Sequence, residues 1–206
     1  MKSAVNYKLY LVTDRDILKG RDICEAVEEA IEGGVTLVQL REKDISTLEF
    51  YNIAFKVKRV TDKYNVPLII NDRLDIALSI DAAGIHVGQD DMPAEIARKL
   101  VGDKKILGVS VATVEEAKKA EKDGADYIGV GAMFPTNSKD DARAVSIEIL
   151  KKIKESVAIP VVAIGGINTK NVSLLEPTNI DGIAVISDVL GKDSIKEAAE
   201  KLIIMI

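Results

Sequence analysis

Three polar side chains occupy alternate positions at the end of an apolar stretch, where Gln39, Arg41 and Lys43 follow the sequence VTLV. In a β-strand, alternate residues lie on one face, so the amide and both cations would point to the same side. Two neighbouring cations repel each other unless negative charge lies opposite them. The spacing therefore predicts an anion-facing surface, and it leaves open whether the anion belongs to the protein or to a ligand.

Two carboxylates, Asp72 and Asp91, follow the apolar stretches 67–70 and 83–87. If these stretches are neighbouring parallel strands, the two side chains lie close together at the carboxyl end of the sheet. Mg²⁺ typically takes one or two carboxylates and completes its shell with water and phosphate oxygens, so the pair predicts a magnesium site. The alternative is that one or both carboxylates cap the helices that follow. Asp90 competes with Asp91, and spacing does not separate the two.

The longest irregular segment, 131–145, contains the sequence PTNSK. Long loops within compact domains are usually functional or disordered. Here the hydroxyls of Thr136 and Ser138 stand beside the amide of Asn137 and the ammonium group of Lys139, a set that suits phosphate oxygens. The segment predicts a phosphate-binding loop, with a solvated surface loop as the alternative.

Glycines and a serine close the last two apolar stretches of the chain, as Gly165-Gly166 and Ser187. Parallel barrels often bind phosphate between their seventh and eighth loops through backbone N–H groups, and glycine lets an anion approach the backbone closely. A plain turn is the alternative at the glycine pair. Together the two positions predict a second anion site, separate from the cationic strand end.

These groups predict electrostatic rather than covalent chemistry. The only histidine, His86, lies inside an apolar stretch, where a hydrogen-bonded structural role is expected, so no Ser-His-Asp triad is available. Mg²⁺ together with lysine and arginine stabilises charge that develops on a departing phosphate group. Two anion sites near one metal therefore favour two phosphorylated substrates and substitution at carbon, with pyrophosphate leaving.

Eight short apolar stretches alternate with amphipathic stretches along the 206 residues. This pattern is typical of a parallel sheet covered by helices, and eight such units fit a small (β/α)₈ barrel. We therefore predict an α/β fold with a single TIM-barrel domain over 1–206. An open doubly wound sheet is the alternative, but no G-x-G-x-x-G follows the first strand. Strands are expected at 8–13, 35–40, 67–70, 83–87, 105–109, 126–130, 160–164 and 181–186, and helices at 22–32, 46–64, 93–100, 114–123, 146–156 and 193–205.

Glycines recur ahead of alternate strands, as Gly33-Gly34, Gly84, Gly124 and Gly182. A glycine just past a helix suits a left-handed C-terminal cap. We therefore expect these glycines to end the helices that precede the second, fourth, sixth and eighth strands. This recurrence of glycine before every second strand is a weak internal repeat, and it supports closure of the sheet into a barrel.

The composition limits the kinds of binding partner and the cellular compartment that we expect for this protein. A net charge of −5 and a pI near 5.1 argue against a nucleic-acid partner. The single cysteine, Cys24, excludes an internal disulfide and predicts a reducing, cytoplasmic setting. No apolar run approaches the roughly 20 residues of a membrane span, so no membrane partner is expected. A homo-oligomer remains open.

In order along the chain, the motifs resemble those of the thiamine-phosphate synthase family, also called thiamine-phosphate pyrophosphorylases. The resemblance covers nearly the whole chain, and the motifs are specific jointly rather than singly. It rests on LYLVTDR (9–15), GGVTLVQLREKD (33–44), PLIINDRLDIAL (67–78), GIHVGQDD (84–91), LGVSVAT (107–113), FPTNSK (134–139), VVAIGGI (161–167) and GIAVIS (182–187).

The resemblance implies a transferase that joins 4-amino-2-methyl-5-hydroxymethylpyrimidine diphosphate to 4-methyl-5-(2-hydroxyethyl)thiazole phosphate. The products would be thiamine monophosphate and pyrophosphate. The implied mechanism is dissociative: pyrophosphate leaves first, and the thiazole nitrogen then captures a pyrimidine-methyl cation. The anion opposite Arg41 and Lys43 would be the diphosphate, with Mg²⁺ on its other side.

The resemblance also assigns roles to individual residues. Asp72 and Asp91 would bind Mg²⁺, which decides between Asp91 and Asp90. The residues implied in catalysis are Arg41, Lys43, Ser110 and Lys139. The pyrimidine diphosphate would be held by Gln39, Arg41, Lys43, Asn71, Ser110 and Lys139, and the thiazole phosphate by Thr136, Ser138, Gly166, Ile186 and Ser187.

Two positions depart from the usual pattern of this family. Position 138 is Ser where the family often has Thr, and the hydroxyl is kept. After Ser110 the family often has Ala-His, whereas this chain has Val111-Ala112. A related thiazole tautomerase on this fold uses a histidine there, so its absence argues against that alternative, as does retention of the metal pair and Lys139. A sensor without activity would typically lose the metal carboxylates, which this chain keeps.

Overall fold

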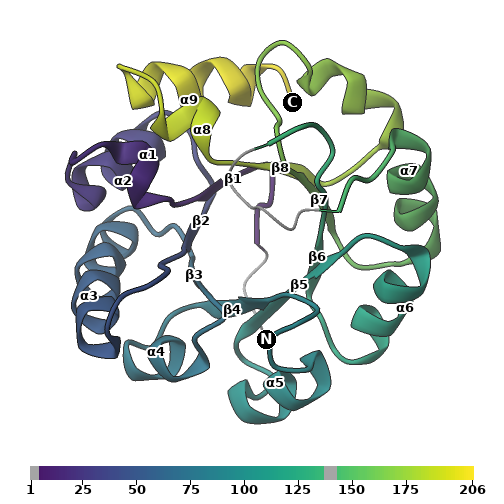
Figure 1. Ribbon diagram of the computed structural model, residues 1–206, viewed down its shortest axis with the longest axis horizontal. Coiled ribbons are helices and arrows are strands. Elements are labelled where there is room, and N and C mark those ends of the chain that lie inside the picture. Colours follow the sequence, from purple (N-terminus) through teal and green to yellow (C-terminus); the bar gives the residue numbers. More distant parts are fainter. Residues whose placement is uncertain (1–4, 137–142) are drawn as a thin grey trace.

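The computed structural model describes residues 5–136 and 143–206, and within them eight parallel strands close into a barrel (Figure 1). Each strand pairs with the next along the chain, and β8 pairs with β1, which closes the sheet. The predicted α/β barrel is confirmed, and the open doubly wound alternative is wrong. The strands are β1 (Leu9–Val12), β2 (Leu37–Leu40), β3 (Leu68–Asn71), β4 (Gly84–Val87), β5 (Ile106–Val111), β6 (Tyr127–Val130), β7 (Val161–Ile164) and β8 (Gly182–Val185).

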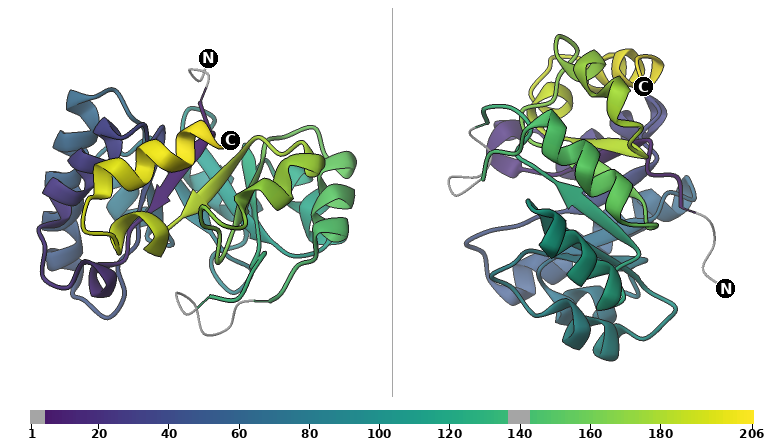
Figure 2. Two further views of the ribbon diagram at one scale, coloured as in Figure 1. Left: turned by 90° about the horizontal axis from the view of Figure 1, so that it is seen from above. Right: turned by 90° about the vertical axis from the view of Figure 1, so that its right-hand side faces the viewer.

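Helices flank the barrel on all sides (Figures 1 and 2). The six predicted helices are α2 (Ile23–Glu32), α3 (Thr47–Lys63), α5 (Ala94–Val101), α6 (Val114–Lys122), α7 (Ile147–Ser156) and α9 (Ile195–Ile204). No helix within the described ranges is both long and apolar enough to cross a membrane. Shorter elements complete the set: α1 (Arg15–Leu18), α4 (Leu74–Ser79), α8 (Ser187–Leu190) and the 3₁₀ helix η1 (Val172–Thr178).

The starts of the longer helices are fixed by local hydrogen bonds. Each of five N-cap side chains accepts a backbone N–H of the first helical turn, which satisfies a donor that the helix itself leaves unpaired. The segment between β7 and β8 differs, because Pro177 lies inside it and has no N–H to donate. This segment forms η1 instead of an α-helix. The five caps are Asp22, Ser46, Thr113, Ser146 and Ser194.

The side chains of each strand alternate between two cores. In β1, Leu9 and Leu11 pack in the layer between the barrel and its helices, whereas Tyr10 and Val12 pack inside the barrel. This alternation follows from the two-residue period of a strand. Tyr10 meets Tyr127 of β6 inside the barrel, with ring centroids 5.9 Å apart. Buried hydroxyls of these tyrosines therefore enter an otherwise apolar interior, and they need hydrogen-bond partners there.

The glycines ahead of the even strands have two different roles. Gly34 and Gly124 have left-handed backbones, with φ of 104° and 93°, as a helix-ending glycine should. The expected cap is wrong for Gly84 and Gly182, which are the first residues of β4 and β8. A Cβ at either position would overlap a backbone carbonyl of the neighbouring segment. These two glycines therefore permit close approach of two backbones.

Candidate active site

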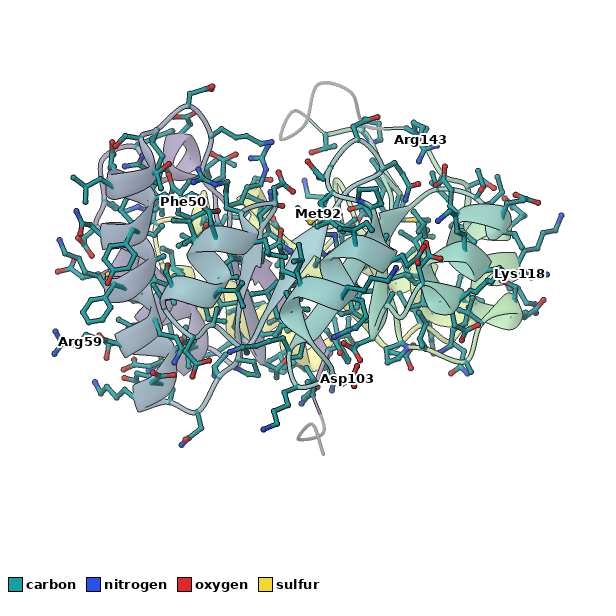
Figure 3. All side chains as sticks on the ribbon, turned by 90° about the horizontal axis from the view of Figure 1, so that it is seen from below. Phe50, Arg59, Met92, Asp103, Lys118 and Arg143 are labelled. Carbon is teal, nitrogen blue, oxygen red and sulfur yellow. The ribbon has the colours of Figure 1, made fainter. Side chains whose placement is uncertain are left out.

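The loops that follow the strands gather at one end of the barrel, which is where parallel barrels carry their active sites. Arg143, after β6, and Asp103, before β5, mark the two opposite ends in Figure 3. Ser138 and Lys139 lie outside the described residues. The structure places the other predicted site residues at the carboxyl ends of strands or in the loops just after them: Gln39, Arg41, Lys43, Asn71, Asp72, Asp91, Ser110, Thr136, Gly166, Ile186 and Ser187.

Two carboxyl groups meet where β3 and β4 end. Asp72 has a left-handed backbone, with φ of 59°, and its N–H donates to the carbonyl oxygen of His86 at 2.9 Å. Burial, then a hydrogen bond to Asp91 and the negative charge of Asp91, raise the pKa of the Asp72 carboxyl to about 6, while Lys43 lowers it. Two carboxyl groups this close favour sharing a proton or a cation between them.

Neither carboxylate is used as a helix cap. The N-cap residues of α4 and α5 are Arg73 and Pro93, and no side chain caps either helix. Asp91 folds back within its own loop, where its Oδ2 accepts the N–H of Gly88 at 2.7 Å. Asp90 acts on a different residue: its charge raises the pKa of Arg143, after the larger effect of the hydrogen bond from Arg143 to Glu116. The structure thus pairs Asp91, not Asp90, with Asp72.

The two cations after β2 face protein carboxylates. The Arg41 guanidinium lies 3.7 Å from Asp14 Oδ2, and Lys43 Nζ lies 3.5 Å from Asp72 Oδ2. Charge-assisted hydrogen bonds are usually about 2.7–2.9 Å long, so both contacts are loose. Lys43 is also half exposed. Both cations are therefore placed to exchange these carboxylates for a stronger anion.

The segment 41–43 is held in place by its neighbours. The Arg41 N–H donates to Thr13 Oγ1 at 3.0 Å, and Glu42 points away from the rim, where its Oε2 accepts from Arg15 Nε at 2.7 Å. The Glu42 side chain is only 2% exposed, and burial raises the pKa of its carboxyl against the opposing charge of Arg15. Sequence reasoning missed Glu42, although an acid between two alternate cations must point to the opposite face.

Polar side chains from the barrel interior form the floor of the site. Gln39 is buried and donates from Nε2 to the Tyr10 hydroxyl at 2.7 Å. Ser110 Oγ lies 2.8 Å from His86 Nε2, so His86 is a buried, hydrogen-bonded residue, as the sequence suggested. Asn71 ends β3 directly beside His86 in the register of the sheet. The floor therefore presents amide and hydroxyl groups beneath the charged rim.

A cleft of about 920 Å³ opens beside the last two strands, and Thr136, Gly166 and Ser187 line it. Ile186 occupies the N-cap position of α8, directly before Ser187. Gly166 has φ of 66°, and a Cβ there would lie 2.5 Å from the carbonyl oxygen of Pro135. Glycine is thus required both by the left-handed backbone and by the approach of the loop after β6.

The carboxylate pair fits a hard cation better than a transition metal. Across 5–136 and 143–206, no group of three or more histidine, cysteine or acidic side chains is placed to hold a metal. A structural or catalytic zinc site needs at least three such ligands, whereas Mg²⁺ uses one or two carboxylates together with water and substrate phosphate. Asp72 and Asp91, whose carboxyl groups are hydrogen-bonded to each other, fit Mg²⁺.

Comparisons with known proteins agree on one family. The family model described as thiamine monophosphate synthase matches residues 9–189. The chain is 66% identical over 194 residues to a thiamine-phosphate synthase of Clostridium tetani, which covers 94% of this chain and 93% of that protein. It is 62% identical over 198 residues to that of Alkaliphilus oremlandii, with 96% and 95% covered. The solved structure of a thiamine phosphate pyrophosphorylase from Pyrococcus furiosus matches with a TM-score of 0.90 at 45% identity, over 97% of this chain and 95% of that one. The chain therefore belongs to the thiamine-phosphate synthase family.

Proposed function

We propose that the protein condenses 4-amino-2-methyl-5-hydroxymethylpyrimidine diphosphate with 4-methyl-5-(2-hydroxyethyl)thiazole phosphate to give thiamine monophosphate and pyrophosphate. The observation that carries the proposal is the Asp72–Asp91 pair with Lys43 beside it at the barrel rim. A metal pair and a lysine suit the departure of a diphosphate. A thiazole tautomerase, which releases no diphosphate, would have no use for them.

The two substrates would occupy two regions of the rim. The pyrimidine diphosphate would lie over the β2–β5 side, where Arg41 and Lys43 hold its phosphates, with Asn71 beside them. The resemblance assigns Lys139, which lies outside the described residues, to the same substrate. Gln39 and Ser110 contact its ring from the floor. The thiazole phosphate lies in the cleft beside β7 and β8, and its proposed ligands are Thr136, Ser138, Gly166, Ile186 and Ser187.

Asp72 and Asp91 are the residues that would hold Mg²⁺. When bound, the ion would neutralise the diphosphate and make it a better leaving group. Lys43 supports the same charge, because its loose contact with Asp72 frees its ammonium group for a phosphate oxygen. Arg41 is similarly free to leave Asp14. Once they are bound to the diphosphate, the two cations would stabilise the charge that develops on it.

In the proposed mechanism the bond between the pyrimidine methylene carbon and the diphosphate oxygen breaks, and both electrons leave with pyrophosphate. The resulting cation is captured by the lone pair of the thiazole nitrogen, which forms the new carbon–nitrogen bond. No protein nucleophile takes part. The protein's contribution is to hold the two substrates in line and to stabilise the leaving group. By the same proposal, the partners are small phosphorylated molecules rather than nucleic acid or membrane, and the enzyme is cytoplasmic.

Three matched variants test the metal assignment: Asp72→Asn, Asp91→Asn and Asp90→Asn each remove one negative charge from the same loops. Formation of thiamine monophosphate is measured while MgCl₂ is varied. We expect the first two variants to lower turnover by roughly 100-fold, the cost typical of losing one charge-stabilising group. Asp90→Asn is expected to keep turnover within about twofold, because Asp91 and not Asp90 is hydrogen-bonded to Asp72. Equal losses in all three variants would contradict the assignment.

A further inference from the structure

A continuous line of hydrogen bonds crosses the interior of the barrel and joins two sides of the site floor. It runs from Gln39 Nε2 to the Tyr10 hydroxyl at 2.7 Å, and from there to the Tyr127 hydroxyl at 2.7 Å. The Tyr127 hydroxyl lies 2.9 Å from His86 Nδ1, and His86 Nε2 lies 2.8 Å from Ser110 Oγ. These five side chains come from β2, β1, β6, β4 and β5, and we call them the interior relay.

The surrounding sequence leaves room for this line. Tyr10, Tyr127, His86 and Gln39 are all buried. A Cβ at Gly108 of β5 would overlap the Tyr127 hydroxyl and crowd His86 Nδ1, and one at Gly129 would lie 3.3 Å from His86 Cε1. Glycines at inward positions of two neighbouring strands therefore make space for the bond between Tyr127 and His86.

With the Gln39 amide nitrogen toward Tyr10, one direction of the relay gives every hydroxyl both a donor and an acceptor. An amide nitrogen can only donate, so the Tyr10 oxygen accepts from Gln39 and its own proton is available to Tyr127. In this direction the Tyr127 proton points to His86 Nδ1, and the proton of the neutral histidine lies on Nε2, facing Ser110. Aligned hydrogen bonds of this kind strengthen one another. Turning the Gln39 amide around would reverse every donor in the line.

Both tyrosines are held as neutral hydroxyl groups. Burial raises the pKa of Tyr10 and of Tyr127 above the usual range for tyrosine. A hydroxyl that stays protonated must both accept and donate within the line. The relay therefore has two states of opposite direction, and the amide orientation of Gln39 chooses between them.

We propose that Gln39, acting through Tyr10 and Tyr127, holds His86 as the Nε2–H tautomer, so that Ser110 turns its own hydroxyl hydrogen toward the substrate. Ring nitrogens of the pyrimidine and diphosphate oxygens are hydrogen-bond acceptors, so a Ser110 donor would bind these groups, whereas the 4-amino group of the substrate would need a different partner. In the reversed relay Ser110 would donate to His86 and would present only lone pairs to these acceptors. The hydrogen bond between Ser110 and the substrate would then be lost. Tyr10, Tyr127 and His86 are thus positioning residues. Their use toward the pyrimidine rests on the proposed function, whereas the direction of the relay does not.

The tautomer can be measured directly, because His86 is the only histidine in the chain. Protein with ¹⁵N-labelled histidine is examined by NMR without substrate, at a pH where the ¹⁵N shifts show that the ring is neutral. We expect the protonated nitrogen to be Nε2 in the wild-type protein. A protonated Nδ1 would overturn the proposal without any variant.

The variant Gln39→Glu tests the long-range control. A carboxylate can only accept, so it draws the Tyr10 proton toward itself and reverses the line. We expect the His86 proton to move to Nδ1, although Gln39 and His86 are separated by two tyrosines. In the double variant Gln39→Glu/Tyr127→Phe the line is cut, and the tautomer should no longer follow position 39. An unchanged tautomer in Gln39→Glu would overturn the proposal, as would the same shift in the double variant.

Activity gives a separate readout for the use of the relay. Tyr127→Phe keeps the ring and removes one hydroxyl, so we expect kcat to fall about tenfold, the rate equivalent of one lost hydrogen bond. KM for the thiazole phosphate should stay unchanged. An unaltered kcat would overturn the role of the relay in the reaction. Wild-type protein with the predicted tautomer but without activity would instead contradict the proposed function alone.

Discussion

A proton and a metal ion would bind to the same carboxyl group, that of Asp72. Its pKa is raised from 3.8 to about 6 by burial and by Asp91, so the folded protein holds a proton there that the unfolded chain has released. Stability from this group is therefore complete below about pH 4 and is lost as the pH rises through about 6. Mg²⁺ needs the deprotonated form, so its affinity should rise over the same interval.

The first prediction is that Asp72→Asn stabilises the protein at pH 7.5 when no divalent metal is present, because asparagine resembles the neutral acid. After allowance for partial solvent exposure, the gain should be on the order of 1 kcal/mol, or about 2–4 °C in melting temperature. At pH 4.5 the gain should vanish, since Asp72 is then protonated in the wild type. Calorimetry at the two pH values measures the difference. A gain of the same size at both would contradict the pKa shift.

At the scale of elements, the end of β2 works because its residues point alternately to two sides. Arg41 and Lys43 reach the rim, whereas Glu42 turns outward to Arg15. Its Oε1 is the one buried side-chain atom without a partner within the described residues. An unsatisfied buried oxygen is costly, and the ion pair of the other carboxylate oxygen with Arg15 opposes that cost. Glu42 thus acts as the anchor of the cationic segment.

The second prediction concerns that anchor. Glu42→Ala removes the closer and more buried of the two carboxylates that contact Arg15 and leaves a cavity in its place, and we expect it to destabilise the protein by about 1–3 kcal/mol. KM for the diphosphate substrate should rise, because Arg41 and Lys43 lose their fixed position. Glu49→Ala is the matched control: it removes the other carboxylate that contacts Arg15, at 3.3 Å and half exposed. Chemical denaturation measures the loss of stability, and steady-state kinetics measure KM for the diphosphate substrate. Equal effects of Glu42→Ala and Glu49→Ala would contradict the role of Glu42 as the anchor of this segment.

The third prediction compares two glycines with similar positive φ. Gly166 and Gly102 have φ of 66° and 70°, so alanine is strained at both positions. Only at Gly166 does the new Cβ also meet the loop after β6, whereas nothing lies within 4 Å at Gly102. Gly166→Ala should therefore raise KM for the thiazole phosphate, and Gly102→Ala should leave it unchanged. The same KM in both variants would show that the cleft does not depend on this approach.

For the whole molecule, the order and positions of the strands could be predicted from the sequence, because each strand is an apolar run with a polar or glycine end. Contacts across the barrel could not. The hydroxyls of Tyr10 and Tyr127 are bonded although 117 positions separate them, and no local pattern signals that pairing. The glycines show the same limit: Gly34 caps a helix, which is a local property, whereas Gly84 makes room for a neighbouring strand.

The site was predictable to a similar degree. Polar strand ends identified the rim, and the resemblance selected Asp91 over Asp90, which spacing alone could not do. Glu42 was missed because its role depends on Arg15, which lies 27 positions away. The proposed roles of Ser138 and Lys139 rest on the sequence alone. What a single sequence lacks, in physical terms, is the distance between side chains on different strands.

The central claim is that one barrel brings a diphosphate and a phosphate substrate together and couples departure of pyrophosphate to formation of a carbon–nitrogen bond. The direct measurement is to supply both substrates at saturating concentration, with and without Mg²⁺, and to quantify both products. We predict pyrophosphate and thiamine monophosphate in equal amounts when both substrates and Mg²⁺ are present, and neither product in appreciable amount when the metal is removed by EDTA. Absence of thiamine monophosphate from the complete mixture, or its undiminished formation in EDTA, would contradict the account.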